Sequence, residues 1–387
     1  MARQYSPKST RSAAFKRALV NVLLASGSLI LALGLMELVL PLLHVFSIDE
    51  AVYQVRRPVV QYIYGAFHPE LRYTLEKNMR DVRLHYPGKL DYTVSTNSQG
   101  FRGPEWDLSP ARRNVVLLGD SFGFGWGVAW DETAGRLLEQ RLQAIDPRFQ
   151  VINLATSGYS IKEVVRCYEL YGKRFNPEMV IYVFCPNDLE SISPPVAPGV
   201  YDLDYHPQPG DAEAFARMRE RNQPGYWSWD KFRRGSYLHA FYARYVRPIL
   251  SRRIRLSLHH DVSPAGYDYP PPLPATTEHP DDAENRFLLY CLSRLQRQVN
   301  GHLLITTTSD KTILVRKDDA QNLRWILATY CREHDKATFV DFEDMARRTP
   351  DGHKLYFKYD DHWTPEGHRA AADLLFAAMR RNGLTRK

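Results

Sequence analysis

The feature that most constrains the fold of this 387-residue chain is an alternation of short apolar runs with amphipathic segments after residue 111. Strand-like apolar runs occur at residues 114–118, 149–154, 179–184, 302–307 and 338–342. Helix-like apolar spacing occurs at residues 133–144, 161–171, 284–299, 319–333 and 364–381. Alternating strands and helices build a parallel sheet with helices on both faces, so we expect an α/β domain over residues 111–387.

Two segments interrupt or precede this alternation. Residues 47–110 show strand-like alternation at 92–95 and a turn at 97–100, and we expect a lead-in segment that packs on the main domain. Residues 190–282 are rich in proline and aromatic residues, which indicates an insertion with at least one helix, near 237–256.

The N-terminus combines a basic tail with a long apolar segment. Residues 1–17 contain five basic residues and no acidic one, and residues 18–36 are uncharged. Nineteen helical residues span roughly 28 Å, close to the thickness of a bilayer's hydrocarbon core. A cleaved signal peptide is the alternative, although its apolar core should be shorter. We expect residues 18–46 to anchor the chain in a membrane, with the basic tail cytoplasmic and the remaining residues on the outer side.

Charge and cysteine content exclude two common classes of partner. The net charge is +7, but residues 1–46 carry +4 of it, and the basic residues of the rest are scattered among acidic ones. We therefore expect no nucleic-acid partner. The four cysteines form no CxxC pair and have no histidine at zinc-like spacing, so we expect no metal and no other cofactor. Disulfides are permitted outside the cytoplasm, but the sequence does not pair them.

A candidate nucleophile follows the first strand of the main domain. The run Gly119-Asp120-Ser121-Phe122-Gly123 comes directly after the strand at 114–118. Active sites of parallel α/β sheets form at the carboxyl ends of the strands, where Ser121 would meet a substrate. The motif alone is weak, since a Gly-Asp-Ser turn also caps helices that have no catalytic role.

A candidate base and its orienting acid lie near the C-terminus. A serine hydroxyl needs a general base, usually a histidine that is itself oriented by a carboxylate. Asp360 and His362 stand two residues apart, just before the last predicted helix. Asp361 is a rival for the orienting role, and His353 and His368 are rivals for the role of base.

Candidate donors for an oxyanion hole follow the next two strands. Gly158 comes after the strand at 149–154, and Asn187 comes after the strand at 179–184. The main-chain N–H groups of Ser121 and Gly158, with the side-chain amide of Asn187, could converge on one developing negative charge. Taken singly, each of the latter two residues is more typical of an ordinary turn.

Taken together, the blocks around Ser121, Gly158, Asn187 and the pair Asp360 and His362 resemble the SGNH (GDSL-like) hydrolase superfamily of esterases, lipases and carbohydrate acyl-processing enzymes. The resemblance covers roughly residues 111–385. It implies a flavodoxin-like three-layer α/β/α sandwich with Ser121 as nucleophile and His362 as base. It also implies an oxyanion hole made by Ser121, Gly158 and Asn187.

Three positions depart from the usual pattern of that superfamily. Phe122 replaces the leucine after the serine, and Cys185 stands where the third block usually opens with glycine. Tyr359 occupies the usual position of the orienting aspartate, so Asp360 takes that role in a two-residue spacing like that of proteins that acetylate alginate and related exopolysaccharides. The apolar anchor and residues 96–105 resemble membrane-anchored bacterial members, which implies a bacterial inner membrane with the main domain on its periplasmic side. Arg102 could support the active site, but we expect it to be a packing or surface residue.

Other folds and functions compete with this interpretation. An α/β-hydrolase also places serine in a G-x-S-x-G turn, but its acid and base usually come from separate loops. A flavodoxin-like cofactor binder would need a phosphate cradle, which Phe122, Phe124 and Trp126 do not suit. A non-catalytic polysaccharide-binding protein is a further alternative. In that case aromatic residues of the insertion would stack on sugars, and the candidates are Trp227, Trp229, Tyr267 and Tyr269. Such residues more often anchor a loop.

The sequence therefore predicts a serine-dependent esterase or O-acyltransferase. We expect its substrate to be an acyl ester, acetyl above all, of cell-envelope or secreted carbohydrate. Polysaccharide-biosynthesis proteins are the expected partners, and a lipid esterase is the alternative within the enzyme class.

Overall fold

The computed structural model describes residues 8–189, 195–223, 233, 235–247, 283–308 and 320–385. By its internal contacts the chain divides into two units, one of residues 1–56 and 227–264 and the other of residues 57–226 and 265–387. Much of the predicted insertion lies outside the described residues, including the four aromatic residues Trp227, Trp229, Tyr267 and Tyr269.

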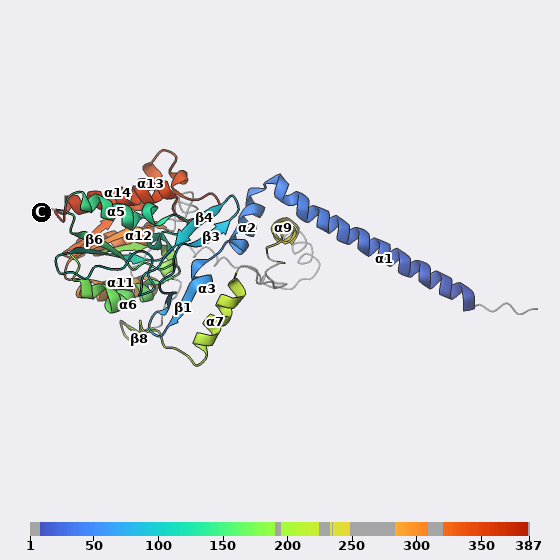
Figure 1. The fold of residues 1–387 in the computed structure, drawn as a ribbon, viewed down its shortest axis with the longest axis horizontal. Helices are drawn as coiled ribbons and strands as arrows, with labels where there is room; N and C mark the ends of the chain where they lie inside the picture. The colour runs from blue at the N-terminus through green and yellow to red at the C-terminus, as the bar shows by residue number, and fades with distance from the viewer. Residues whose placement is uncertain are drawn as a thin grey trace, which may run out of the picture. The chain divides into compact units, whose positions relative to one another are not determined.

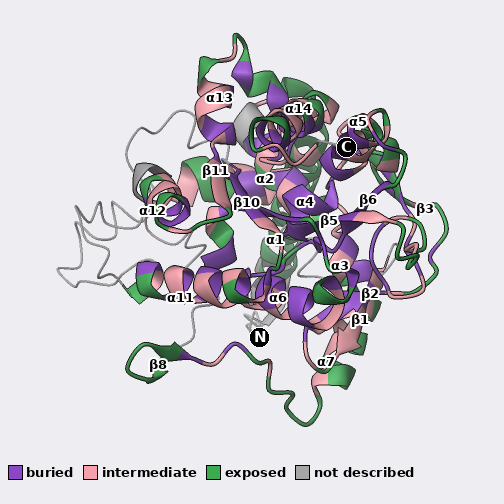
Figure 2. Ribbon diagram, turned by 90° about the vertical axis from the view of Figure 1, so that its left-hand side faces the viewer, coloured by how far each residue is buried: buried purple, intermediate pink, exposed green. Residues whose placement is uncertain are grey.

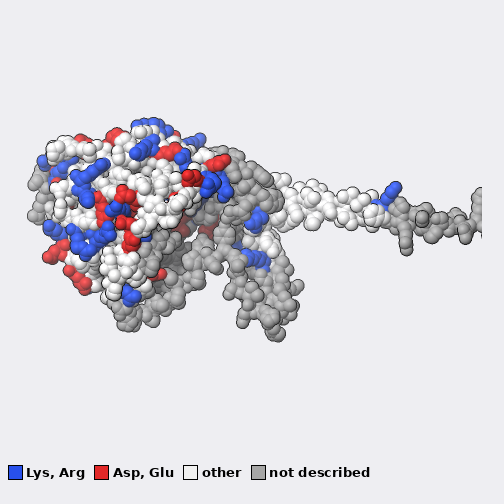
Figure 3. All heavy atoms as spheres, turned by 90° about the horizontal axis from the view of Figure 1, so that it is seen from below, with Lys and Arg blue, Asp and Glu red and all other residues white. Residues whose placement is uncertain are grey.

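The main element of the first unit is the long helix α1 (Lys8–Val39) (Figure 1). The apolar stretch Phe15–Leu43 is long and apolar enough to cross a membrane or to serve as a signal sequence. Its side chains are exposed, and the part of the helix that Figure 3 colours is almost wholly in the white of uncharged residues. The predicted apolar segment thus forms a helix whose surface does not suit water.

Two shorter helices complete the described part of the first unit. They are α2 (Phe46–Arg56) and α9 (Tyr237–Phe241), the latter continued by a π-helical turn at Tyr242–Val246. The carboxylate of Glu37 accepts hydrogen bonds from the N–H groups of Tyr237 (2.9 Å) and Leu238 (2.7 Å) and so caps α9. The remainder of the helix predicted near 237–256 lies outside the described residues.

A five-stranded parallel sheet forms the centre of the second unit. Its strands are β5 (Arg113–Gly119), β6 (Phe149–Asn153), β7 (Met179–Phe184), β10 (His302–Thr307) and β11 (Ala337–Val340). Their spatial order is β11-β10-β7-β5-β6, and all four pairings are parallel. This is the doubly wound, flavodoxin-like order, in which the chain reverses direction across the sheet beside its first strand.

Helices cover both faces of the sheet, as Figures 1 and 2 show. One face carries α6 (Ile161–Cys167), α11 (Ala283–Gln298) and α12 (Ala320–Glu333), and the other carries α5 (Ala134–Gln143), α13 (Phe342–Arg348) and α14 (Pro365–Arg381). Successive residues of a strand point to opposite faces, so Val116 packs into the first layer and Val115 into the second. The predicted fold class, a three-layer sandwich around a parallel sheet, is confirmed.

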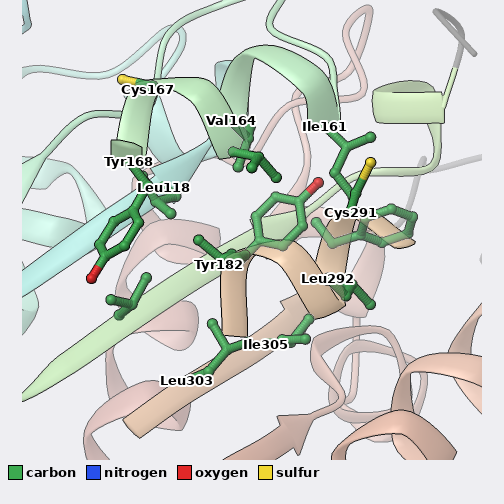
Figure 4. Close-up of a cluster of buried hydrophobic side chains, with 14 of the residues drawn as sticks. Leu118, Ile161, Val164, Cys167, Tyr168, Tyr182, Cys291, Leu292, Leu303 and Ile305 are labelled. Atoms are coloured by element: carbon green, nitrogen blue, oxygen red, sulfur yellow. The ribbon is translucent and has the colours of Figure 1, made fainter. Parts of the chain in front are cut away.

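The layer beneath α6 and α11 forms the larger core. Figure 4 shows the ring of Tyr182, from β7, between side chains of α6 and α11. Ile161, Val164 and Leu292 around it are no more than 1% exposed. Apolar burial of roughly 25 cal/mol per Å² at such positions stabilises the attachment of these helices to the sheet. A rigid sheet is what holds the loops at its carboxyl edge in place.

The segment before the sheet folds into one short helix and two hairpins. The helix is α3 (Val60–Tyr64), and the antiparallel pairs are β1 (Gly65–His68) with β2 (Arg72–Leu75) and β3 (Val82–Tyr86) with β4 (Leu90–Val94). The strand and turn predicted at 92–95 and 97–100 are present, with Gly100 N–H donating to Asn97 O at 3.1 Å. Beyond β7, β8 (Pro195–Ala197), β9 (Val200–Tyr201) and α7 (Asp211–Asn222) are described.

Most predicted elements of the sheet domain agree with the structure, and two boundaries are wrong. The strand predicted at 338–342 ends at Val340, because Asp341 caps α13 and Phe342 begins that helix. The helix predicted at 161–171 ends at Cys167 and continues as a π-helical turn over Tyr168–Gly172.

On the face seen in Figure 3, basic and acidic side chains are intermixed. All four cysteines are buried free thiols.

Candidate active site

Ser121 begins the short helix α4 (Ser121–Phe124), directly after the strand β5, which lies between β7 and β6 in the sheet. Asp120 caps this helix, its carboxylate accepting from Phe122 N–H at 2.9 Å. Gly119 has φ +145°, and a Cβ there would lie 2.7 Å from the carbonyl oxygen of Val183 in β7, so glycine is required for this sharp exit from the strand. Ser121 is 7% exposed at the carboxyl edge of the sheet.

His362 reaches Ser121 from the loop that precedes α14. The loop is closed by a bridge between Tyr356 and Trp363 and by a 3.0 Å hydrogen bond from Phe357 N–H to the carbonyl of His362. Nε2 of His362 lies 2.6 Å from Oγ of Ser121. The imidazole packs between two aromatic rings, with centroids 5.0 Å from Phe122 and 5.3 Å from Trp126, which fixes its orientation.

Asp360, not Asp361, lies behind the imidazole. Its carboxylate accepts from Nδ1 of His362 and from Nε1 of Trp126 (3.3 Å), and it forms an ion pair with Arg57. Burial alone would raise the pKa of this carboxyl, but His362 and Arg57 hold that pKa well below its usual range. The carboxylate is therefore ionised, and with Nδ1 protonated Nε2 is the acceptor for the serine hydroxyl.

The two other histidines near the loop are placed elsewhere. His368 is 1% exposed, its Nδ1 accepts from Ala134 N–H at 3.2 Å, and burial lowers its pKa to about 3. It therefore remains neutral and caps the start of α5. His353 is exposed on the turn Gly352–Leu355. Neither is hydrogen-bonded to Ser121.

Gly158 and Asn187 follow the two strands that flank β5. Gly158 has φ +83°, a conformation that suits glycine, and its turn is held by Tyr73, whose hydroxyl donates to Ser157 O at 2.6 Å. Asn187 lies in the 3₁₀ turn Pro186–Leu189, and both residues are exposed. Because β7, β5 and β6 are neighbours, Ser121, Gly158 and Asn187 lie at one edge of the sheet.

Buried aspartates organise the turns that present these donors. Burial raises the pKa of Asp120, opposed by hydrogen bonds from Phe122 N–H and from the side-chain amide of Asn187. The amide of Asn187 thus lies beside the turn that carries Ser121. Asp188 accepts from the Tyr182 hydroxyl (2.7 Å) and from Cys185 N–H (3.1 Å), and burial raises its pKa well above the usual value.

Arg102 is a packing residue, as expected, and it braces the loop after α4. It is 2% exposed and donates to the carbonyls of Thr93 (3.0 Å), Phe124 (3.2 Å), Gly125 and Val128 (2.7 Å). Burial lowers the pKa of this guanidinium to about 10. The braced loop includes Trp126, which donates to Asp360.

Sequence reasoning missed two contacts of the site, those of Arg57 and Trp126 with Asp360. Arg57 lies 303 residues from Asp360 in the chain, and no motif connects them. Trp126 gives a usable signal, since it is a bulky aromatic residue five positions after the candidate nucleophile. Among the residues that the structure describes, no cluster of three or more His, Cys, Asp and Glu side chains could hold a metal ion.

Comparisons with known proteins identify the family. Residues 117–370 match the model of the GDSL-like Lipase/Acylhydrolase family. No curated protein matches the chain. The chain is similar to a lipase/acylhydrolase from Enterococcus faecalis (9% identity, 70% of this chain and 96% of that one, TM-score 0.39). It is also similar to a family 3 carbohydrate esterase from Clostridium thermocellum (10% identity, 70% and 96%, TM-score 0.37). The sequence match spans well over half of the chain, which therefore belongs to the GDSL-like lipase/acylhydrolase (SGNH hydrolase) family.

Proposed function

We propose that this protein is a serine esterase or O-acyltransferase that acts on acyl esters, acetyl above all, of cell-envelope or secreted carbohydrate. The observation that carries the catalytic part is the chain of contacts from Ser121 Oγ to His362 Nε2, at 2.6 Å, and from His362 Nδ1 to Asp360. These contacts support Ser121 as nucleophile, His362 as base and Asp360 as orienting acid.

The proposed reaction proceeds through an acyl-serine. His362 Nε2 removes the hydroxyl proton as Ser121 Oγ attacks the ester carbonyl, and Asp360 stabilises the imidazolium that forms. The main-chain N–H groups of Ser121 and Gly158 and the amide of Asn187 donate to the oxyanion. When the carbon–oxygen bond breaks, His362 returns the proton to the departing alcohol. Water or a sugar hydroxyl then takes the acyl group from Ser121.

The proposed location is the periplasmic side of an inner membrane, with α1 as an uncleaved span. The length and apolar surface of Phe15–Leu43 and the basic residues at its N-terminal end support this arrangement. An outward-facing domain would meet envelope or secreted polysaccharide and the proteins that make it. The Asp-x-His spacing of the last block, similar to that of exopolysaccharide-acetylating proteins, supports acetyl as the acyl group.

A paired assay tests substrate class and direction. The purified full-length chain is incubated with acetylated oligosaccharides alone, and with unacetylated oligosaccharides plus an acetyl-ester donor. Release of acetate in the first reaction indicates hydrolysis, and acetylated product in the second indicates transfer. Both activities must be lost in Ser121→Ala. Activity confined to long-chain lipid esters would overturn the carbohydrate part of the proposal.

A further inference from the structure

A pocket of about 330 Å³ opens beside two of the residues assigned to the oxyanion hole. Gly158 and Asn187 line it, whereas Ser121 does not. Apart from residues 158–160 and Asn187, the wall of this pocket comes from α3 and β2, which precede the part of the chain that matches the family, and from α7. The shared family chemistry therefore does not dictate what this wall binds.

The wall is aromatic rather than aliphatic. The rings of Tyr73 and Phe215 lie 5.5 Å apart between centroids, and Tyr62 offers a ring that is 45% exposed. Flat aromatic faces suit the C–H face of a sugar ring. A long acyl chain would instead favour a channel of aliphatic side chains, and Met218 is the one aliphatic side chain among the described residues that line this pocket.

The wall also contains a polar atom whose hydrogen-bonding capacity is unused. Oε1 of Gln61 is buried and has no hydrogen-bond partner in the structure. An unsatisfied buried acceptor costs about 1 to 3 kcal/mol, so such groups usually meet a donor when the site is in use. The amides of Gln61 and Asn187 both line the pocket and can pair with ligand hydroxyl groups as donor and acceptor.

The charge of the pocket is already balanced. Arg72 is the one charged side chain among the described lining residues, and it donates from its terminal nitrogen to the carbonyl of Gly158 at 3.1 Å. Its Nε lies 3.6 Å from the carboxylate of Glu163, which is 12% exposed. The charges of Arg72 and Glu163 sum to zero, so the pair presents no excess positive charge to a carboxylate or sulfate on a ligand.

We propose that this pocket binds a neutral, hydroxyl-rich ring of the carbohydrate ester, with Gln61 and Tyr62 determining specificity. The proposal rests on the function proposed above and names the substrate class of the same site. The volume of the pocket is near the lower end of the range for ligand pockets, about 300 to 1,000 Å³, which suits a small ring better than a long chain. Tyr62 stacks on the ring, and Gln61 accepts a hydrogen bond from one of its hydroxyl groups.

Steady-state kinetics of the full-length protein tests this assignment. The substrates are acetylated neutral oligosaccharides, acetylated uronate oligosaccharides and p-nitrophenyl acetate, which has no sugar. Gln61→Met and, independently, Tyr62→Ala should raise KM for the neutral oligosaccharide about tenfold, the effect of one lost neutral hydrogen bond or ring contact. The change with p-nitrophenyl acetate should be much smaller. Tyr62 is exposed, so its variant tests the pocket even if Gln61→Met folds poorly.

Gln296→Met is the matched control, since Gln296 also has a buried, unpartnered Oε1 but does not line the pocket. Its KM should equal that of the wild type. An unchanged KM in both pocket variants, with turnover of the neutral ester intact, would overturn the pocket assignment alone. A preference for uronate esters would overturn the neutral-ring class. Turnover of p-nitrophenyl acetate without turnover of any glycan ester would instead overturn the proposed carbohydrate function.

Discussion

Among individual residues, Asp360 determines how well the site is assembled. It is 3% exposed and bonds to His362, Trp126 and Arg57. A buried carboxylate with this many donors holds the imidazole in one tautomer and one orientation. Its neighbour Asp361 has the same side chain but does not lie behind the ring.

Asp360→Asn should therefore lower kcat on the order of 10³- to 10⁴-fold, because an amide favours the wrong imidazole tautomer. Asp361→Asn should change kcat by at most a few-fold. The folding of both variants is first checked by circular dichroism. Their rates with p-nitrophenyl acetate then show which of the two aspartates orients His362. A larger loss in Asp361→Asn would show that the orienting acid is misassigned.

Arg57 positions Asp360, and its removal should alter the pH dependence. Without the ion pair, burial moves the pKa of Asp360 upward, so the carboxylate becomes protonated at a pH at which it is ionised in the wild type. For Arg57→Met we expect the acid limit of kcat/KM to move to higher pH. Arg57→Lys should restore part of the wild-type profile. A uniform fall in rate with an unchanged profile would indicate a purely structural role.

The residues of the site that follow strand ends were predictable from the sequence, and their distant supports were not. Ser121 and Asn187 each follow a largely buried strand, and the carboxyl edge of a parallel sheet collects such residues. Which of Asp360 and Asp361 lies behind the imidazole depends on the path of the loop before α14. The contact with Arg57 depends on how the start of the second unit folds back, which no local pattern encodes.

Among the elements, the loop after α4 connects the lead-in segment to the site. Arg102 donates hydrogen bonds to four backbone carbonyls. One belongs to the last residue of α4, two to the loop after it and one to β4. The loop carries Trp126 to Asp360, so its bracing is transmitted to the orienting acid.

Arg102→Lys should lower the free energy of unfolding by about 2 to 4 kcal/mol, because one ammonium cannot satisfy four buried carbonyls. Chemical denaturation with a fluorescence readout measures this change. The control Arg80→Lys removes an exposed guanidinium that also donates to backbone carbonyls, and its effect should stay within about 0.5 kcal/mol. Equal losses in the two variants would contradict the bracing role.

The elements that the sequence predicted best are those buried on both faces. The strands expected at 179–184 and 302–307 match β7 and β10 residue for residue, because continuous apolar runs between turn signals leave few alternatives. The hairpin β1-β2 and the strand β3 were not predicted, since strands of four or five residues give too short a pattern to recognise. Helix α13 was not predicted, because the apolar side chain of Phe342 continues the pattern of the strand before it.

For the whole molecule, the central question is how α1 is used. An exposed apolar helix at this position serves either as a permanent span or as a cleaved signal. The uncharged run of residues 18–36 is longer than a signal core of about 7 to 15 residues, and five basic residues precede it.

We expect the full-length chain to stay in the membrane fraction after an alkaline carbonate wash. In spheroplasts, protease added from outside should digest the catalytic domain while an N-terminal tag remains protected. Recovery of a shortened soluble protein that lacks the N-terminal residues would show instead that the helix is cleaved. Protection of the catalytic domain in intact spheroplasts would reverse the proposed orientation.

The central claim, that Ser121 is an activated nucleophile, is tested most directly by covalent labelling with a fluorophosphonate probe. An activated serine beside a histidine base displaces fluoride and retains the phosphonyl group, whereas ordinary serines do not react at a comparable rate. The wild-type protein should carry one label on the peptide that contains Ser121, identified by mass spectrometry, and Ser121→Ala should carry none. Equal labelling of the two proteins, or no labelling of a folded wild type, would contradict the claim.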